Sequence, residues 1–213
     1  MSDRLIVFFN YCLSYFFNVK GIVLAGGESR RFGENRLLIK IHGMYLISYV
    51  IKALDNSSFI NEVLISTTDK FRDDYGRLGY KVILDDLMMG PIGAVYLAVR
   101  EFGDCFIAAG DMPLLKTELV DIIIGKFYRE GGVACIPRWS DGFLEPLCGV
   151  YSKGIVGKLC EYIENGGRSI QEFLRDLEIT FVDIDSLPSH LRKCFFNVNT
   201  RDDLERILSD IGL

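Results

Sequence analysis

A loop that opens on two glycines and continues with arginines is the first stretch of this chain that could do chemistry. It reads GIVLAGGESRRFGENRLL and spans residues 21–38. Gly26 and Gly27 can adopt backbone conformations closed to other residues, which lets backbone N–H groups approach a ligand and form an anion-binding nest. Arg31 and Arg36 supply forked donors that suit phosphate oxygens. The loop predicts a triphosphate cradle; the alternative is a glycine turn with solvated arginines.

This loop differs from two common phosphate-binding motifs. No Lys-Ser or Lys-Thr pair follows Gly33, so the loop lacks the lysine and hydroxyl group of a P-loop. The GxGxxG spacing of a dinucleotide-binding loop is also absent. The sequence therefore predicts a phosphate-binding loop of another kind.

Aspartates follow two apolar runs further along the chain. Asp111, in AAGDMPLL, comes directly after one of them, and Pro113 stiffens the turn behind it. Mg²⁺ prefers one or two carboxylates together with phosphate oxygens and water, so Asp111 is suited to hold Mg²⁺ against an α-phosphate. Asp85 and Asp86 end the other run and could bind a nucleotide or a metal-bound water. The alternative for these two aspartates is helix capping or turn formation.

The segments that must position these residues alternate in character along the chain. Short apolar runs occupy residues 21–25, 62–66, 81–84 and 105–109, and segments with helical spacing occupy residues 45–54, 92–100 and 117–128. This alternation predicts parallel strands joined by right-handed helical crossovers. The runs are apolar throughout, as strands are when helices cover both faces of a sheet. We therefore expect an α/β fold with a mostly parallel sheet.

The residues after each predicted strand share a composition. They read, in chain order, GGESRRFG, TTDK, DDLMMGP and GDMPLL. Ligands of open α/β sheets bind beyond the carboxyl ends of the strands. The recurrence of glycines and carboxylates after the strands therefore predicts a binding edge on one side of the sheet.

The overall composition narrows the class of protein. A chain of 213 residues with 49% hydrophobic and 25% charged residues is ordinary for one substantial globular domain. Its net charge of −5 argues against a general nucleic-acid binder. Two histidines are too few for a histidine-rich metal site, and their scarcity argues against a Ser-His-Asp triad. Six cysteines without a CxxC pair indicate reduced thiols in a cytoplasmic protein.

The first eighteen residues differ from the rest. The apolar run from Leu5 to Phe17 is shorter than the roughly twenty residues of a spanning helix. No small-residue cleavage site follows it, and the chain continues directly into NVKGIVLAGG. We expect residues 1–18 to be a non-essential extension without stable membrane insertion, and the folded domain to occupy residues 19–213. The alternative is a peripheral anchor or a partner contact.

The motifs together resemble a known family. LAGGESRRFG, LLIKIHG, GP, GDMPLL and FFNVNTRDDL look like those of the molybdenum cofactor guanylyltransferases, part of the nucleotidyltransferases with the LAGGxSxRxG signature. The resemblance runs from Val19 to the C-terminus, and NVNTRDDL narrows it towards the molybdopterin branch. It implies a single-domain, Rossmann-like three-layer sandwich of the nucleotide-diphospho-sugar transferase type. It also implies transfer of GMP from Mg·GTP to molybdopterin, with release of pyrophosphate.

The resemblance assigns residues to the site. Asp111 matches the magnesium ligand, and Asn197 and Asn199 match an asparagine motif near the pterin side. Ser66 occupies a place after the second strand where an asparagine often touches the nucleotide, and SDGFLEPLCGVY resembles a hairpin that shapes the acceptor pocket. The nucleotide-binding positions are Leu24, Ala25, Gly26, Gly27, Arg36, Ser66, Asp85 and Asp111.

Two departures from the family pattern bear on activity. Asn35-Arg36 replaces the usual Asp-Lys pair, and a planar guanidinium must contact phosphate differently from an ammonium. Glu145-Pro146 stands where a His-Pro pair is common. These changes leave open an altered acceptor, an altered nucleotide or weakened activity.

The mechanism implied is an in-line attack by the acceptor's terminal phosphate on the α-phosphorus. Asp111-bound Mg²⁺ would bridge the α-phosphate and the attacking oxygen, and Arg31 and Arg36 would stabilise the departing pyrophosphate. A phosphate with a second pKa of about 6 is already ionised near neutral pH, so no general base is needed.

Alternatives remain within and outside this class. The residues do not identify a reader of the base, so a molybdenum cofactor cytidylyltransferase, or an enzyme acting on another phosphorylated small molecule, stays open. A non-catalytic nucleotide- or cofactor-binding protein is the alternative from another class. The expected partners are GTP, molybdopterin and molybdoenzyme maturation proteins.

Three further stretches carry local predictions. Trp139 could stack on a pterin or serve packing. Ser169, after Gly166-Gly167-Arg168, is a helix N-cap candidate, and the stretch is also compatible with phosphate. Residues 200–208 predict a capped final helix with Leu204, Ile207 and Leu208 on one face.

Overall fold

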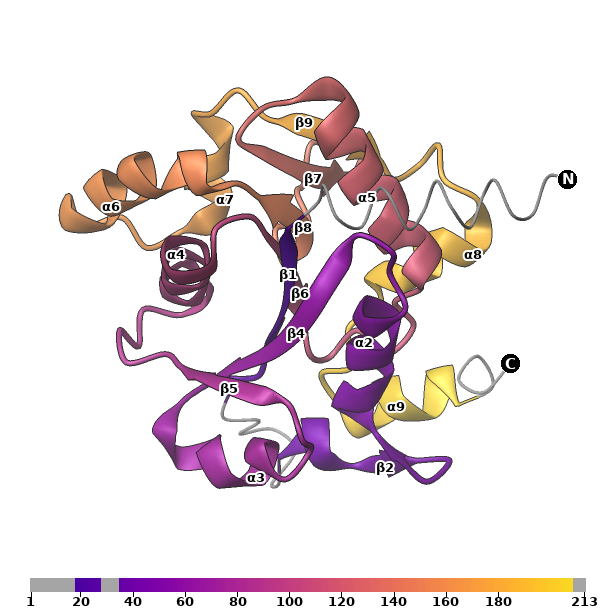
Figure 1. Ribbon diagram of the computed structural model, residues 1–213. Coiled ribbons are helices and arrows are strands. Elements are labelled where there is room, and N and C mark those ends of the chain that lie inside the picture. The colour runs from indigo at the N-terminus through magenta and orange to yellow at the C-terminus, as the bar shows by residue number, and fades with distance from the viewer. Residues whose placement is uncertain (1–17, 28–34, 209–213) are drawn as a thin grey trace, which may run out of the picture.

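The computed structural model describes residues 18–27 and 35–208, and a seven-stranded sheet forms its centre (Figure 1). The order of the strands across the sheet is β5-β4-β1-β6-β8-β7-β9. A separate two-stranded ribbon pairs β2 with β3. The strands are β1 (Val19–Leu24), β2 (Lys40–Ile41), β3 (Met44–Tyr45), β4 (Ile60–Thr67), β5 (Lys81–Leu84), β6 (Cys105–Ala109), β7 (Ala134–Arg138), β8 (Cys148–Tyr151) and β9 (Thr180–Asp183).

Most neighbouring strands run parallel, and β8 is the exception. The β5-β4-β1-β6 half is parallel throughout, and β7 pairs with β9 in the same way. β8 runs antiparallel to both β6 and β7. A short connection between β7 and β8 forces this direction, because parallel neighbours need a long crossover. The predicted α/β fold with a mostly parallel sheet is confirmed.

Helices cover both faces of the sheet and complete three layers (Figure 1). α2 and α5 pack on one face, and α4, α6 and α7 pack on the other. The described helices are α2 (Leu46–Asp55), α3 (Arg72–Gly76), α4 (Pro91–Phe102), α5 (Thr117–Glu130), α6 (Val156–Glu164), α7 (Ile170–Arg175), α8 (Ser189–Arg192) and α9 (Arg201–Ile207). Short 3₁₀ turns are η1 (Arg36–Leu38), η2 (Asp69–Phe71), η3 (Lys153–Ile155) and η4 (Lys193–Phe195).

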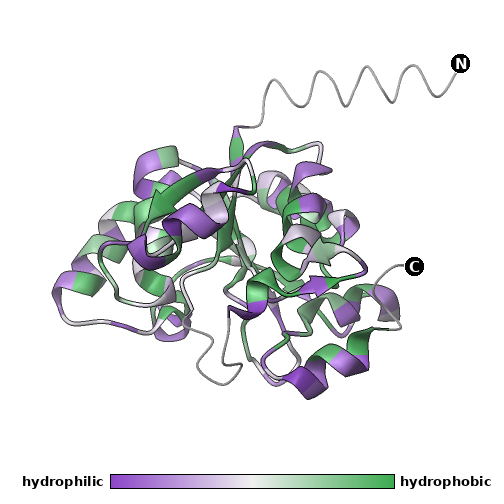
Figure 2. Cartoon of the chain, turned by 90° about the horizontal axis from the view of Figure 1, so that it is seen from below, coloured by the Kyte–Doolittle hydropathy of each residue, from purple (hydrophilic) through white to green (hydrophobic). Residues whose placement is uncertain are grey.

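Alternation along the central strands builds a core on each face. In β1, Ile22 packs with α4 while its neighbour Val23 packs with α2 and α5. In β6, Phe106 packs on the face covered by α2 and α5, and Ile107 packs on the face covered by α4. Successive side chains of a strand point to opposite faces. The strands are correspondingly hydrophobic along their length (Figure 2). Two apolar layers therefore hold the sheet rigid behind its loops.

The predicted segments match the observed elements, with ends that differ by one or two residues in most of them. β5 and β6 have the predicted bounds, whereas β1 runs from Val19 to Leu24 and β4 from Ile60 to Thr67. Ser66 consequently lies inside a strand, and the prediction that it follows the strand is wrong. The final helix begins as predicted, with a capping box between Thr200 and Asp203. Leu208 is the C-cap residue beyond the last helical turn and is 42% exposed, so the helix ends one residue before the predicted position.

The apolar run from Leu5 to Phe17 lies outside the described residues. Within the parts of the chain that the structure describes, no helix has the length and hydrophobicity to cross a bilayer. The five described cysteines are all free thiols, as predicted, and four of them are buried.

Candidate active site

Six neighbouring strands each have one end at the same edge of the sheet. Parallel pairing puts the carboxyl ends of β5, β4, β1 and β6 on this edge, and the antiparallel β8 begins there. β7 ends on the same edge because it is antiparallel to β8. Across the edge, in strand order, the adjoining residues are Asp85, Thr68, Gly26, Gly110-Asp111, Leu147 and Trp139. The predicted binding residues on either side of Asp111 therefore belong to one continuous rim.

The start of the glycine loop is fixed by the strands beside it. Ala25 donates its N–H to the Ser66 carbonyl at 2.7 Å, and Thr67 Oγ1 donates to the Ala25 carbonyl at 3.0 Å. Thr67 is fully buried and was not among the predicted site residues. Its signal in the sequence is a hydroxyl residue at the end of an apolar run, which is too common to be specific.

Gly26 and Gly27 are exposed and have ordinary backbone conformations. Neither has a positive φ, so the structure does not use the conformations that the sequence allows at these two glycines. A Cβ at Gly26 would lie 4.0 Å from Thr68, and a Cβ at Gly27 would have no heavy atom within 4 Å. Among residues 18–27 and 35–208, no atom requires a glycine at either position or fills the space above the backbone. Arg31 lies outside the described residues.

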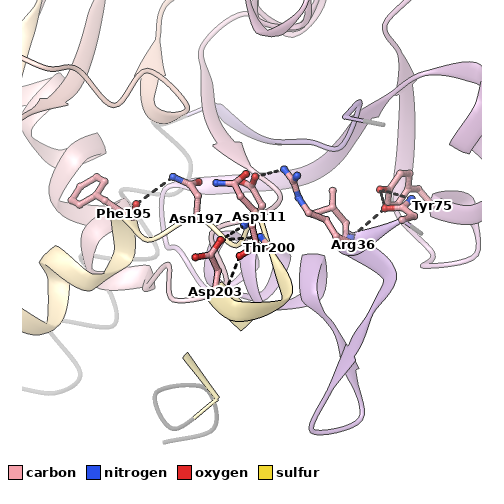
Figure 3. A network of polar contacts seen from close by, with 10 residues as sticks. Arg36, Tyr75, Asp111, Phe195, Asn197, Thr200 and Asp203 are labelled. Carbon is pink, nitrogen blue, oxygen red and sulfur yellow. Dashed lines mark hydrogen bonds and ion pairs between the residues drawn. The ribbon is translucent and has the colours of Figure 1, made fainter. Parts of the chain in front are cut away.

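Arg36 and Asp111 form an ion pair at the centre of the rim (Figure 3). Arg36 Nη2 lies 2.5 Å from Asp111 Oδ2, and the two side chains are 21% and 14% exposed. Burial raises the pKa of the Asp111 carboxyl group, and the adjacent guanidinium acts in the opposite direction. The predicted phosphate contact and the predicted magnesium ligand thus touch each other.

Asn35 fixes the turn that carries Arg36. Its Oδ1 accepts from the N–H of Leu37 at 3.2 Å and caps η1. Its Nδ2 lies 3.0 Å from the hydroxyl group of Tyr75, which is fully buried and whose pKa burial raises to about 12 (Figure 3). An aspartate could only accept from this hydroxyl group, whereas the amide can also donate. Asn35, which stands where the family pattern has an aspartate, can therefore both accept from and donate to Tyr75. This contact is a second attachment of η1, in addition to the cap on Leu37.

Gly110 lets the Asp111 loop pass close to β1. Its N–H donates to the Leu24 carbonyl at 3.0 Å. A Cβ on Gly110 would lie 3.0 Å from that same carbonyl oxygen and 3.0 Å from Leu37 Cδ1. The position of Asp111 therefore depends on a residue without a side chain immediately before it.

The segment before α9 joins the rim beside Asp111. Val198 donates its N–H to the Asp111 carbonyl at 2.9 Å. Asn197 Nδ2 donates to the Phe195 carbonyl at 3.3 Å, and its side chain lies beside Asp111 (Figure 3). The N–H of Asn199 donates to Asp203 Oδ2 in the cap of α9. The structure thus brings Asn197 to Asp111 and ties Asn199 to the helix cap.

Asp85 and Ser66 lie on the other half of the rim. Asp85 Oδ1 accepts from the N–H of Met88 at 3.3 Å, so this carboxylate closes a turn, the alternative foreseen for it. Burial raises the pKa of Asp85. Ser66 is only 4% exposed, inside β4. Nucleotide contact by either side chain remains a prediction.

The hairpin between β7 and β8 carries Trp139. Its backbone N–H donates to the Phe143 carbonyl at 2.9 Å, which confirms the predicted hairpin. The indole Nε1 donates to Glu145 Oε1 at 2.8 Å, and the ring packs edge-on against Phe195 with centroids 5.9 Å apart. Burial raises the pKa of Glu145, against the effect of this hydrogen bond. The contacts of Trp139 are those of a packed side chain, which is the second of the two roles predicted for it.

The Gly-Gly-Arg stretch serves a helix end. Gly166 has a φ of +87° after α6, and Arg168 Nη1 donates to the carbonyls of Gly167 and Ile163 at 2.8 and 3.3 Å. Ser169 accepts from the N–H of Glu172 and caps α7, as predicted. The capping alternative is confirmed here.

The described side chains include no group of three or more histidines, cysteines, aspartates or glutamates that could hold a metal ion. Mg²⁺ bound with a nucleotide does not need one, since phosphate oxygens and water fill most of its coordination positions. Asp111 offers a carboxylate, a hard oxygen donor, at the centre of the rim. This donor set fits Mg²⁺ held jointly with phosphates.

The chain is similar in sequence and fold to known proteins. A family profile described as "MobA-like NTP transferase domain" matches residues 21–180. A "Probable molybdenum cofactor guanylyltransferase" of Thermococcus gammatolerans is 43% identical over 187 residues, covering 88% of this chain and 97% of the relative. A Pyrococcus furiosus protein of the same description is 39% identical over 189 residues, covering 89% and 96%. The crystal structure of molybdopterin-guanine dinucleotide biosynthesis protein A from Archaeoglobus fulgidus superposes with a TM-score of 0.77 at 28% identity, covering 90% and 98% of the two chains.

Proposed function

The chain belongs to the family of MobA-like NTP transferase domains, and we propose that it transfers GMP from GTP to molybdopterin. The products are molybdopterin guanine dinucleotide and pyrophosphate. The observation that carries this proposal is the 43% identity to a molybdenum cofactor guanylyltransferase along nearly its whole length. The rim around Asp111 supports this proposal. It combines exposed glycines, the guanidinium of Arg36 and the carboxylate of Asp111 at the carboxyl ends of parallel strands.

We assign the nucleotide to the half of the rim formed by β5, β4 and β1. Gly26 and Gly27 leave their backbone open to phosphate oxygens, and Leu24 and Ala25 lead into this loop. Arg36 places a guanidinium between this half and Asp111. Two positive groups, Arg31 and Arg36, are proposed to neutralise the departing pyrophosphate, and neutralising charge is the main task in such transfers.

Mg²⁺ is the proposed cation, held by Asp111 and the phosphates of the nucleotide. A bound divalent cation would supply charge neutralisation at the α-phosphate. Asp111 must be ionised for this role, and burial works against ionisation while Arg36 favours it. Pairing with Arg36 thus favours the ionised carboxylate of Asp111, a hard oxygen donor, although the side chain is mostly buried.

The acceptor is assigned to the other half of the rim. Asn197 lies beside Asp111, and Asn199 follows it at the start of α9. The attacking phosphate is already ionised near neutral pH, so the residues need to position it and do not need to remove a proton. We also propose that residues 19–213 suffice for the reaction, in the cytoplasm, and that molybdoenzyme maturation proteins receive the product.

Pyrophosphate release tests the proposal. The full chain and a chain beginning at Val19 are incubated with Mg²⁺, molybdopterin and GTP, CTP, ATP or UTP in turn. We expect release with GTP from both chains. Release with CTP alone would replace this function with the cytidylyl one. A folded protein that binds nucleotide and releases nothing would support a non-catalytic binding protein instead.

A further inference from the structure

Glu145 is a half-buried carboxylate without a positive partner among residues 18–27 and 35–208. Its one side-chain hydrogen bond is from the neutral indole of Trp139, 2.8 Å from Oε1. An ionised carboxylate has room for about four hydrogen bonds. Burying a charge that is not fully compensated is costly. The site therefore retains an acceptor with unused capacity.

Holding Trp139 in place does not account for the charge. A glutamine has the same side-chain oxygen in the same position and would accept the indole N–H without the cost of burying a carboxylate. The negative charge at Glu145 is therefore surplus to the packing of the hairpin. A surplus charge on a half-buried side chain of a binding rim indicates a ligand with N–H donors.

The position of Glu145 decides which ligand this is. Asp111 follows β6, and the glycine loop follows β1 on one side of it, whereas the hairpin of Glu145 precedes β8 on the other side. Trp139 links this hairpin to Phe195, which lies in the segment that contacts Asp111 (Figure 3). Glu145 therefore belongs to the half of the rim away from the predicted nucleotide phosphates.

We propose that Glu145 recognises the pterin ring of the acceptor, its carboxylate accepting N–H bonds from the 2-amino group and the adjacent ring nitrogen. This inference rests on the proposed function for the identity of the acceptor. Two neighbouring donors match the two lone-pair directions of a carboxylate, and charge-assisted bonds of this kind are strong. Guanine carries the same two donors, so GTP is the competing source of this chemistry.

Trp139 reports on this contact directly. It is the only tryptophan in the chain, and its indole is bonded to the same carboxylate. Neopterin, a stable pterin that absorbs where tryptophan emits, is the probe. We expect neopterin to quench Trp139 fluorescence saturably and GTP to leave it unchanged. Quenching by GTP, or none by neopterin, would overturn the proposal.

Two variants separate recognition from structure. Glu145→Gln keeps an acceptor for Trp139 and removes the charge, so neopterin affinity should fall about 10- to 100-fold. Glu130→Gln removes a charge from the exposed C-terminal end of α5, where Oε1 pairs with Lys126 away from the rim, and should leave affinity unchanged. Equal affinities of the parent and E145Q would refute the contact. Thermal unfolding checks that E145Q is folded.

Kinetics distinguish this proposal from the function on which it rests. E145Q should raise the KM for molybdopterin about tenfold or more and change the KM for GTP less than about twofold. A rise in the KM for GTP alone would move the contact to guanine and overturn the proposal. If the parent binds neopterin in a Glu145-dependent manner but releases no pyrophosphate, the proposed function fails and the pterin contact stands.

Discussion

At the scale of single residues, Arg36 and Asp111 depend on each other before any ligand binds. Burial favours the neutral carboxyl group and so raises the pKa of Asp111, and the neighbouring guanidinium favours the ionised one. A carboxylate that binds Mg²⁺ must be ionised. In addition to the phosphate contact proposed for it, Arg36 therefore favours the ionised form of Asp111.

Removing the guanidinium should make stability depend on pH. In Arg36→Ala, the folded-state pKa of Asp111 rises further above its unfolded value. The stability that a group with a raised folded pKa contributes is present below the unfolded pKa and is lost as pH rises through the folded one. We expect R36A to be about 1–3 kcal/mol less stable than the parent at neutral pH, with a smaller deficit in acid. Urea unfolding between about pH 4 and 7 measures this.

The double variant R36A/D111N is the control for that experiment. It lacks the carboxyl group whose titration causes the effect, so its deficit should not vary in the same pH range. An R36A deficit that stays constant with pH would contradict the assigned role of Arg36.

Asp111→Asn should separate activity from stability. Asparagine still accepts a hydrogen bond from Arg36 but carries no charge to bury, so the free energy of unfolding at neutral pH should not fall. Pyrophosphate release should fall more than about a hundredfold, because the variant loses an anionic ligand of the cation. Turnover near that of the parent would remove Asp111 from the catalytic residues.

At the scale of elements, the rim is positioned by close backbone contacts between strand ends and short turns. Gly110 fits between the end of β1 and η1, the turn that carries Arg36. Val198 ties the start of α9 to the Asp111 loop, and the capping box of α9 fixes that start in turn. Adding one methyl group at a strand end should therefore shift the side chains of the site.

Gly110→Ala tests this spacing against a matched substitution. Its Cβ would approach Leu24 O and Leu37 Cδ1 to 3.0 Å, so we expect a loss of about 1–3 kcal/mol in the free energy of unfolding and reduced turnover. Gly125→Ala, inside α5 with no heavy atom within 4 Å of the new Cβ, should gain up to about 1 kcal/mol. Equal stabilities of the two variants in urea would show that the gap beside Gly110 is looser than its geometry indicates.

At the scale of the molecule, local patterns predicted the sheet but not the contacts across the rim. Apolar runs and helical spacing predicted four parallel strands and the edge at which Asp111 lies. The Arg36–Asp111 pair joins residues 75 positions apart in the sequence, and no local pattern encodes such a contact. The same holds for Trp139 against Phe195. Ser66 was misplaced because the apolar run does not show where the hydrogen bonding of β4 ends.

Because all the rim loops belong to one sheet, nucleotide binding should stabilise the whole chain. A ligand at a hundred times its Kd adds about 2.7 kcal/mol, which for a chain of this size raises Tm by roughly 5–10 °C. We expect GTP with Mg²⁺ to give a shift of this size, and GTP with EDTA a smaller one. In D111N the two shifts should be equal, because the link between cation and protein is lost. Equal shifts in the parent would place the cation on the nucleotide alone, and Asp111 would then act through Arg36.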